Sequence, residues 1–336
     1  MREWVLEYLR CLDIEIRVSK WDRWTGEPYS GIIKCDNKTY YIRRGIAILL
    51  DIKTDPVSRI KGLYEALPAA PWKASRSDWI RHMRYIHLRM LIDALVANKE
   101  RGEGTLNILA LGCGWGWEAW ALRALLKRLN YKRFRIIGID IANKPLKLAR
   151  KLLREMREEN IDFMVSPAER LPFKNASFDF VTGLFGVLDH SKVYPLIFKE
   201  VSRVLNPGGI FVFTVLNKFA LDWMIKVIKN PRLYIKTVKK AKDPFTRVTI
   251  PLPKGGSIRI PTHYYNPTEV GKLVRKYGFE KIRAYGLFSI LPMNFKKKKF
   301  DLHHEALSKL ERRICDVFPV YLFGRYLGMI VKKTSQ

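Results

Sequence analysis

The stretch Ile108-Leu-Ala-Leu-Gly-Cys-Gly-Trp-Gly116 decides how the rest of the chain is interpreted. Four apolar residues lead into three glycines at alternating positions, and a helix-favouring run follows from Glu118 to Leu129. Glycine adopts positive φ at little cost and lets a ligand touch the backbone, so the pattern predicts a strand, a tight turn and a helix. The N–H groups that begin such a helix favour a carboxylate or a phosphate. The stretch therefore predicts a site for a nucleotide-type cofactor.

Strand and helix patterns alternate on the C-terminal side of this turn. Strands are expected at 107–111, 134–140, 161–165, 178–184 and 210–216, and helices at 118–129, 144–158 and 193–205. This alternation predicts an α/β fold, a doubly wound, mostly parallel sheet with helices on both faces. Later helices at 267–277 and 302–317, with strands at 279–287 and 321–332, bring the expected sheet to seven strands.

The chain divides by pattern into three parts. Residues 1–60 are expected to form a small β-rich appendage, because short segments alternate or are rich in β-branched and aromatic side chains. Residues 61–104 have apolar positions at helical spacing and form a helical connector. The main domain takes 105–336, interrupted at about 217–262 by an inserted helical cap with an apolar and a basic face.

The formal net charge of +30 is the main anomaly of composition. Residues 217–299 hold 20 Lys/Arg against 4 Asp/Glu, so this quarter of the chain carries a surplus of 16. A basic surface attracts polyanions, which points to RNA or an anionic membrane. A generally basic proteome in an organism that lives hot would give a similar total. The concentration of charge in one segment favours the functional interpretation.

Cysteine usage and hydropathy narrow the class of protein. Cys11, Cys35, Cys113 and Cys315 are far apart with no C-x-x-C pair, which predicts reduced thiols and no metal site. No apolar run approaches the roughly 20 residues that span a bilayer, and the N-terminus lacks the pattern of a signal peptide. We therefore expect a cytoplasmic protein, with peripheral membrane association as an option.

Asp140 ends the second expected strand, where a carboxylate can accept hydrogen bonds from both ribose hydroxyls. A dinucleotide fingerprint would need Gly-x-Gly-x-x-Gly, but the bulky Trp117 occupies the position of its third glycine. The spacing in this chain is instead Gly-x-Gly-x-Gly. We therefore expect a cofactor that contains a nucleoside but is not a dinucleotide.

Five motifs in this order carry a family resemblance: the glycine turn, Gly138-Ile-Asp140, Ala168-Glu-Arg-Leu-Pro-Phe173, Ser177-Phe-Asp-Phe-Val181 and Arg203-Val-Leu-Asn-Pro-Gly-Gly209. Over about 105–216 the chain resembles the Rossmann-like S-adenosylmethionine-dependent methyltransferases of the quinone-biosynthesis type. The resemblance implies S-adenosylmethionine as cofactor. The cofactor-binding residues that it implies are Gly112, Cys113, Gly114, Gly116, Asp140, Ile141, Ala168, Glu169 and Leu184.

Two positions depart from the family pattern. The family usually has an acidic residue where this chain has Ala110, and an aspartate where it has Pro167. The first departure weakens anchoring of the cofactor's amino group, for which nearby Glu118 is a candidate substitute. The second removes an acceptor for the adenine amino group. Each lost buried partner would cost about 1–3 kcal/mol of affinity.

Methyl transfer from a sulfonium is a direct displacement, so it needs positioning and, for some acceptors, one base. The polar candidates at the acceptor are His190, His263 and Tyr264, while for both histidines a structural role is an equally good interpretation. The leading hypothesis is methylation of a small or lipid-like acceptor. Two alternatives stay open: an RNA methyltransferase, and a non-catalytic RNA- or membrane-binding module with a degenerate site. No DNA-binding motif occurs.

Overall fold

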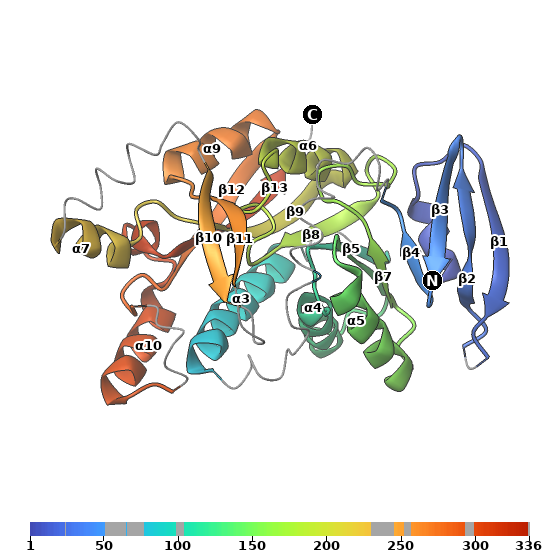
Figure 1. Cartoon of the computed structure of the whole chain (residues 1–336). Helices are drawn as coiled ribbons and strands as arrows, with labels where there is room; N and C mark the ends of the chain where they lie inside the picture. Colours follow the sequence, from blue (N-terminus) through green and yellow to red (C-terminus); the bar gives the residue numbers. More distant parts are fainter. Residues whose placement is uncertain are drawn as a thin grey trace.

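The computed structural model describes residues 1–23, 25–50, 65, 77–98, 104–229, 245–251, 257–292 and 299–334. One twisted sheet runs across the molecule with helices on both faces, and a separate two-stranded hairpin stands over it (Figure 1). The predicted doubly wound α/β fold is confirmed.

The large sheet has the strand order β1-β2-β3-β4-β7-β6-β5-β8-β9-β13-β12. Its strands are β1 (Ile14–Trp21), β2 (Pro28–Cys35), β3 (Lys38–Arg43), β4 (Ile46–Ile48), β5 (Leu106–Leu111), β6 (Phe134–Asp140), β7 (Ile161–Val165), β8 (Phe178–Gly183), β9 (Leu205–Leu216), β12 (Phe279–Leu287) and β13 (Tyr326–Lys333). The strands from β7 to β9 are parallel, and β13 and β12 complete them in antiparallel pairing. These seven match the expected number, and the four appendage strands extend the same sheet.

Helices cover both faces of the parallel strands (Figure 1). The helices are α3 (Asp78–Ala97), α4 (Trp117–Arg128), α5 (Asn143–Glu155), α6 (Tyr194–Val204), α7 (Leu221–Lys229), α9 (Pro267–Lys276) and α10 (Leu302–Ile314), with the 3-10 turns η1 (Glu3–Tyr8) and η3 (Val320–Phe323). Ile108 and Ala110 face the apolar layer of α3, α4 and α5, whereas Leu109 and Leu111 face that of α6 and α9. Because both faces are covered, β5 is apolar except at Asn107. No described helix is long and apolar enough to cross a membrane.

The appendage is joined to the main sheet by strand pairing. Strand β4 lies parallel to β7, with Ala47 opposite Met164 and Ile48 opposite Val165. The segment just after η1 also pairs with the chain beyond β7: the Arg10 N–H donates to the Pro172 carbonyl at 2.8 Å. The Lys174 N–H in turn donates to the Tyr8 carbonyl at 2.8 Å. The division into appendage, connector and main domain stays a prediction. Strand pairing within one sheet nevertheless joins the appendage directly to the main domain.

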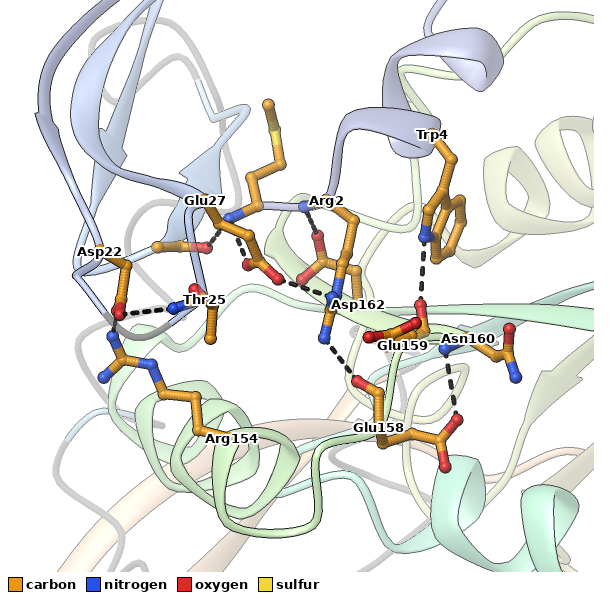
Figure 2. Close-up of polar contacts among 12 residues, drawn as sticks. Arg2, Trp4, Asp22, Thr25, Glu27, Arg154, Glu158, Glu159, Asn160 and Asp162 are labelled. Carbon is orange, nitrogen blue, oxygen red and sulfur yellow. Dashed lines mark hydrogen bonds and ion pairs between the residues drawn. The ribbon is translucent and has the colours of Figure 1, made fainter.

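A buried ionic cluster closes the junction between appendage and main sheet, and Figure 2 shows the contacts of Arg2 with Glu27 and Asp162 in it. Arg150 of α5 bonds Asp162 of β7 at 2.5 Å and also pairs with Glu27, which precedes β2. Arg2 contacts the same two carboxylates, its Nη1 lying 2.7 Å from Glu27 Oε1 and its backbone N–H 2.5 Å from Asp162 Oδ2. Removing one partner of such a pair costs about 3–5 kcal/mol because a buried charge is left uncompensated. The appendage is therefore locked in place by charge as well as by strand pairing.

The prediction of four reduced thiols was wrong for one pair. Cys11 and Cys35 form a disulfide with a Cα–Cα distance of 5.3 Å, whereas Cys113 and Cys315 are free and buried. Pairing of β1 with β2 sets Ile14 opposite Cys35, which brings Cys11 alongside. Sequence spacing does not reveal this register. The described residues contain no group of three or more histidine, cysteine or acidic side chains placed to hold a metal ion.

Candidate cofactor and acceptor site

The glycine turn between β5 and α4 uses its three glycines for two different purposes. All three have positive φ: 58° at Gly112, 54° at Gly114 and 88° at Gly116. A Cβ at Gly112 would collide with Val187, and one at Gly116 would lie 2.7 Å from the ring of Phe163. A Cβ at Gly114 would have no atom within 4 Å. The outer glycines are therefore needed for packing, and Gly114 presents open backbone on which a ligand fits.

Asp140, at the end of β6, is bonded to this turn. Its Oδ2 accepts from the Gly114 N–H at 2.9 Å, and its Oδ1 accepts from the Ala142 N–H at 2.8 Å. Burial raises the pKa of Asp140 to about 6, against the lowering effect of these donors. Asp140 is therefore ionised at neutral pH. The Ile141 N–H is a third donor to this carboxylate. A carboxylate offers about four lone-pair sites, so one remains for a ribose hydroxyl while these three bonds are made.

The other cofactor candidates gather at the carboxyl ends of β5 to β8. Ala168 and Leu184 are buried, and Ile141 and Glu169 are half-buried. The Ser166 N–H donates to the Asp140 carbonyl at 3.1 Å, which ties the loop after β7 to the end of β6. The Cys113 side chain is buried, and burial raises the pKa of its thiol well above its usual value. Cys113 therefore offers a ligand its backbone and not a reactive thiolate.

Glu118, in the first turn of α4, places a buried carboxyl beside these strand ends. It is 5% exposed, and its Oε2 accepts from the Thr182 hydroxyl of β8 at 2.7 Å. Burial raises the pKa of Glu118 to about 8, and the nearby Asp140 raises it further, while bonds from Thr182 and the Leu184 N–H lower it. This carboxyl is therefore mostly protonated at pH 7 when no cation lies beside it.

His190, after β8, has its tautomer set by two neighbours. Its Nδ1 lies 3.2 Å from the Pro261 carbonyl oxygen and 3.2 Å from Thr262 Oγ1. The Thr262 hydroxyl donates to the Ile260 carbonyl at 3.1 Å, so it accepts from the histidine. Nδ1 therefore carries the proton and Nε2 has the lone pair. A Cβ on Gly186 would lie 3.1 Å from Nε2, so this nitrogen faces the loop after β8.

Asp189 and His190 are adjacent in the chain, and their pKa values are shifted in opposite directions. Asp189 is fully buried; its Oδ1 accepts from the Leu216 N–H at 2.8 Å, and its Oδ2 has no hydrogen-bond partner among the described residues. Burial raises the pKa of Asp189 to about 8, and burial lowers the pKa of His190. At neutral pH the acid is therefore protonated and the imidazole is neutral. The pair provides a hydrogen-bond donor and a base without net charge.

The structure separates the other two catalytic candidates. His263 Nε2 lies 2.7 Å from Glu269 Oε1, and its ring stacks on Tyr194 at 4.7 Å. These contacts pack β11 (Ser257–His263) against α6 and α9, so a structural role accounts for His263. Tyr264 is half-buried, and burial raises its pKa; the charges that act on it next are those of Arg325 and Asp189. Tyr264 therefore lies near enough to Arg325 and Asp189 for their charges to act on it.

A family model described as a methyltransferase domain matches residues 109–213. An uncharacterized protein of Methanocaldococcus jannaschii is 31% identical over 280 residues, which cover 82% of this chain and 91% of that protein. The chain belongs to the Rossmann-like S-adenosylmethionine-dependent methyltransferases. The demethylmenaquinone methyltransferase of Lactococcus lactis is 37% identical over 112 residues, 33% of this methyltransferase and 42% of that protein.

Two further comparisons complete the picture. The ubiquinone biosynthesis O-methyltransferase of Idiomarina loihiensis is 30% identical over 134 residues, which are 40% of this chain and 51% of that protein. The chain thus spans about half of the length of these quinone-biosynthesis relatives. Among solved structures, a putative sarcosine dimethylglycine methyltransferase from Galdieria sulphuraria covers 76% of this chain and 88% of its own, with 17% identity and a TM-score of 0.49.

Two aromatic residues, Phe185 and Tyr326, lie together at the loop after β8 of this methyltransferase. The rings of Phe185 and Tyr326 lie 5.8 Å apart, and the Phe185 N–H donates to Thr214 Oγ1 at 2.8 Å. Phe185 has a φ of 59°, which is rare for a residue with a side chain and often marks a functional loop. No sequence motif predicts that Tyr326 lies at this site, because β13 pairs with β9 only in the folded sheet.

Proposed function

We propose that this methyltransferase transfers a methyl group to a ring hydroxyl of a small, lipophilic, quinone-type acceptor. The observation that carries the proposal is the tautomer of His190, whose Nε2 lone pair faces the loop after β8. A hydroxyl is a poor nucleophile until a base accepts its proton. The names of the quinone-biosynthesis relatives support the same acceptor class.

The cofactor site fits S-adenosylmethionine in the open face at Gly114 and the ionised Asp140. We assign the methionine part to the backbone of the turn, the ribose to Asp140, the adenine side to the loops after β6 and β7, and the sulfonium side to the loop after β8. The residues so assigned are Gly112, Cys113, Gly114, Gly116, Asp140, Ile141, Ala168, Glu169 and Leu184. When bound, the cofactor supplies a methyl group on a sulfonium, ready for direct displacement.

The residues of the chain would then do three things for the acceptor. The rings of Phe185, Tyr326 and Tyr264 would bind an apolar ring. The protonated Asp189 would donate a hydrogen bond inside the buried site. Nε2 of His190 would accept the hydroxyl proton as the oxygen attacks the methyl carbon in line. A site that is neutral before the reaction suits a neutral acceptor.

A product assay tests this function directly. The purified protein is incubated with methyl-labelled S-adenosylmethionine and either a short-chain prenylated hydroquinone or catechol, and products are identified by mass spectrometry. We expect O-methylated ring product. Methylation at a ring carbon would contradict the hydroxyl assignment, and no turnover of any ring compound would contradict the acceptor class.

RNA is the second candidate acceptor, because the surplus of 16 basic residues lies in 217–299. If RNA is the acceptor, affinity must fall steeply with salt, with a slope of about 0.7 per phosphate contact for single strands. Total RNA added to the same assay measures this alternative. Labelled RNA without labelled ring product would replace the proposal.

A further inference from the structure

The small residue at 110 lies in register with the strand position to which Glu118 is bonded. In the parallel pairing of β5 with β8, Ala110 lies opposite Thr182. The Glu118 carboxyl reaches the same Thr182 from α4, with an oxygen–oxygen distance of 2.7 Å. The family resemblance leads us to expect an acid on β5. Glu118 instead places an acid beside the adjoining strand β8, from the neighbouring helix α4. Among the described residues, Glu118 makes no ion pair.

Arg84 of α3 brings a cation to the glycine turn. The Arg84 guanidinium of α3 lies 5.6 Å from the ring centroid of Trp115 and 5.3 Å from that of Trp117. Arg84 is half-buried, burial lowers its pKa, and within the described ranges no carboxylate pairs with it. Contact with an aromatic face stabilises a cation but does not neutralise it. The tryptophans hold the guanidinium at the turn with its charge unpaired.

The groups around Arg84 leave an anion-favouring environment. Helix α4 has Gly116 as N-cap and no side chain capping its first N–H groups. The acid in its first turn is Glu118, which is mostly protonated at pH 7, so the helix N-terminus carries partial positive charge. His87, between Arg84 and Trp117, remains neutral because burial, and then the charge of Arg84, lowers its pKa to about 3. Of Arg84, His87 and the N-terminus of α4, Arg84 thus carries the full positive charge.

We propose that Glu118 and Arg84 hold the two charged ends of the amino-acid part of the cofactor, the ammonium on Glu118 and the carboxylate between Arg84 and the N-terminus of α4. Among the described residues, neither the Glu118 carboxyl nor the Arg84 guanidinium at this turn has a partner of opposite charge, and an α-amino acid zwitterion supplies both. The inference rests on the cofactor site proposed above. It explains how the chain keeps its cofactor anchored although position 110 is alanine.

Ligand truncation tests the assignment without any acceptor. Isothermal titration measures the binding of S-adenosylhomocysteine, of the analogue that lacks only its amino group, of the analogue that lacks only its carboxylate, and of methylthioadenosine. Each ligand is titrated into the wild type, Glu118→Gln and Arg84→Gln. Glutamine at 118 keeps an acceptor for Thr182, and Arg81→Gln on the exposed side of α3 is the matched control for Arg84→Gln.

We expect Glu118→Gln to weaken S-adenosylhomocysteine about 10- to 100-fold and Arg84→Gln about 5- to 20-fold, because charge-assisted hydrogen bonds are lost. The matching truncated analogue should show almost no effect: about twofold or less for Glu118→Gln with the deaminated ligand, and for Arg84→Gln with the decarboxylated one. Methylthioadenosine should bind all variants equally.

Proton release gives a readout that a merely structural Glu118 would not move. Because Glu118 has a pKa of about 8, it is protonated at pH 7 and must ionise to pair with an ammonium group. Titration in two buffers of different ionisation enthalpy should show close to one proton released on binding S-adenosylhomocysteine. Glu118→Gln and the deaminated ligand should release none, and the wild type should release less above pH 8.

Two results would overturn the proposal. Equal losses on full and truncated ligands would mean that the two side chains shape the turn without touching the cofactor. Unchanged binding of S-adenosylhomocysteine in both variants would exclude them as anchors. If the wild type bound no S-adenosylhomocysteine at all, the cofactor site itself would be wrong, which is a separate outcome. Equal melting temperatures across the variants guard against loss of folding.

Discussion

The two halves of the carboxyl edge of the sheet, the proposed cofactor half and the proposed acceptor half, are built in different ways. On the cofactor half, the turn after β5 and Asp140 after β6 are short local features that contact each other through adjacent parallel strands. On the acceptor half, His190 meets Thr262 from 72 residues away, and Phe185 meets Tyr326 across the sheet. The cofactor half is thus encoded in short motifs, whereas the acceptor half exists only after β11 and β13 are in place.

This difference predicts separable effects of mutation. A ligand common to a large family can be held by backbone and one or two side chains, which motifs preserve. An acceptor specific to one enzyme needs side chains gathered from distant segments. Substitutions on the cofactor half should therefore change the binding of S-adenosylhomocysteine, and those on the acceptor half should change turnover and leave this binding intact.

Gly114→Val should have the largest effect. A branched side chain fills the open face of the turn, so S-adenosylhomocysteine binding should fall below detection. Gly26→Val is the matched control, since Gly26 also has positive φ, 66°, and open space around a built Cβ. Both variants should lose similar stability, and only the first should lose binding in isothermal titration. Loss of folding specific to Gly114→Val would make the turn structural.

His190→Asn should reduce turnover by at least about 100-fold, the usual contribution of a positioned base. The dissociation constant of S-adenosylhomocysteine should stay within about twofold, because His190 lies on the acceptor half. The pH–rate profile should also lose its acidic limb, which the lowered pKa of His190 places below the usual histidine range. Wild-type turnover in His190→Asn would exclude the base.

Asp140→Ala should weaken S-adenosylhomocysteine by about 2–3 kcal/mol, because hydrogen bonds to a charged group are the stronger kind. The turnover number at saturating cofactor should change far less. Asp140→Asn separates two contributions, since it keeps one acceptor for the Gly114 or Ala142 N–H but loses the charge. An unchanged dissociation constant in Asp140→Ala would refute the ribose assignment.

Acidification should act on the cofactor half in the same direction. Asp140 is ionised above about pH 6, and protonation below that pH removes acceptor lone pairs. Affinity for S-adenosylhomocysteine in Glu118→Gln, where ionisation of Glu118 cannot contribute, should therefore fall as the pH drops from 7 to 5, by at most tenfold per pH unit. The slope should disappear when Asp140→Asn is added to this variant. A slope that persists in the double variant would assign the titration to another group.

The smallest effect is expected from the cap that follows β9. Ile228 is 76% exposed on α7, and burying it in a lipid interface would contribute roughly 25 cal/mol per Å². Ile228→Ala should weaken association with anionic vesicles several-fold, with Leu12→Ala, whose side chain is also exposed, as control. The basic residues Lys236, Lys239 and Lys240 lie outside the described residues. Replacing them should flatten the salt dependence if RNA binds there instead.

Sequence patterns located the sheet well because both of its faces are buried. The expected strands 134–140, 161–165 and 279–287 coincide with β6, β7 and β12. The inserted cap was expected to be helical, but its described part contains α7 and the hairpin of β10 (Phe245–Pro251) with β11. That hairpin lies outside the main sheet, so burial on two faces does not impose a recognisable hydrophobic pattern on its sequence. The disulfide was missed for a similar reason, since register alone brings its cysteines together.

At the candidate site, the glycine turn and Asp140 could be proposed from the sequence because their chemistry demands particular residues at particular spacing. Glu118 was suggested only as a substitute, and its contact with Thr182 could not be seen without the pairing of β5 with β8. Arg84 was missed altogether, because one arginine in a basic chain carries no signal. Its significance comes from the two tryptophans around it and from the absence of an acid among the described neighbours.

The pairing of β4 with β7 also determines when, during synthesis, the appendage can join the main sheet. Ala47 and Met164 are neighbours in the sheet but lie 117 positions apart in the chain. At about 5–20 residues per second, a ribosome needs roughly 6–23 s to deliver the partner strand. During that interval the appendage has a bare edge, open to the wrong strand. Its own hairpins and the bond between Cys11 and Cys35 are all made within the first fifty residues, so it can keep its shape while it waits.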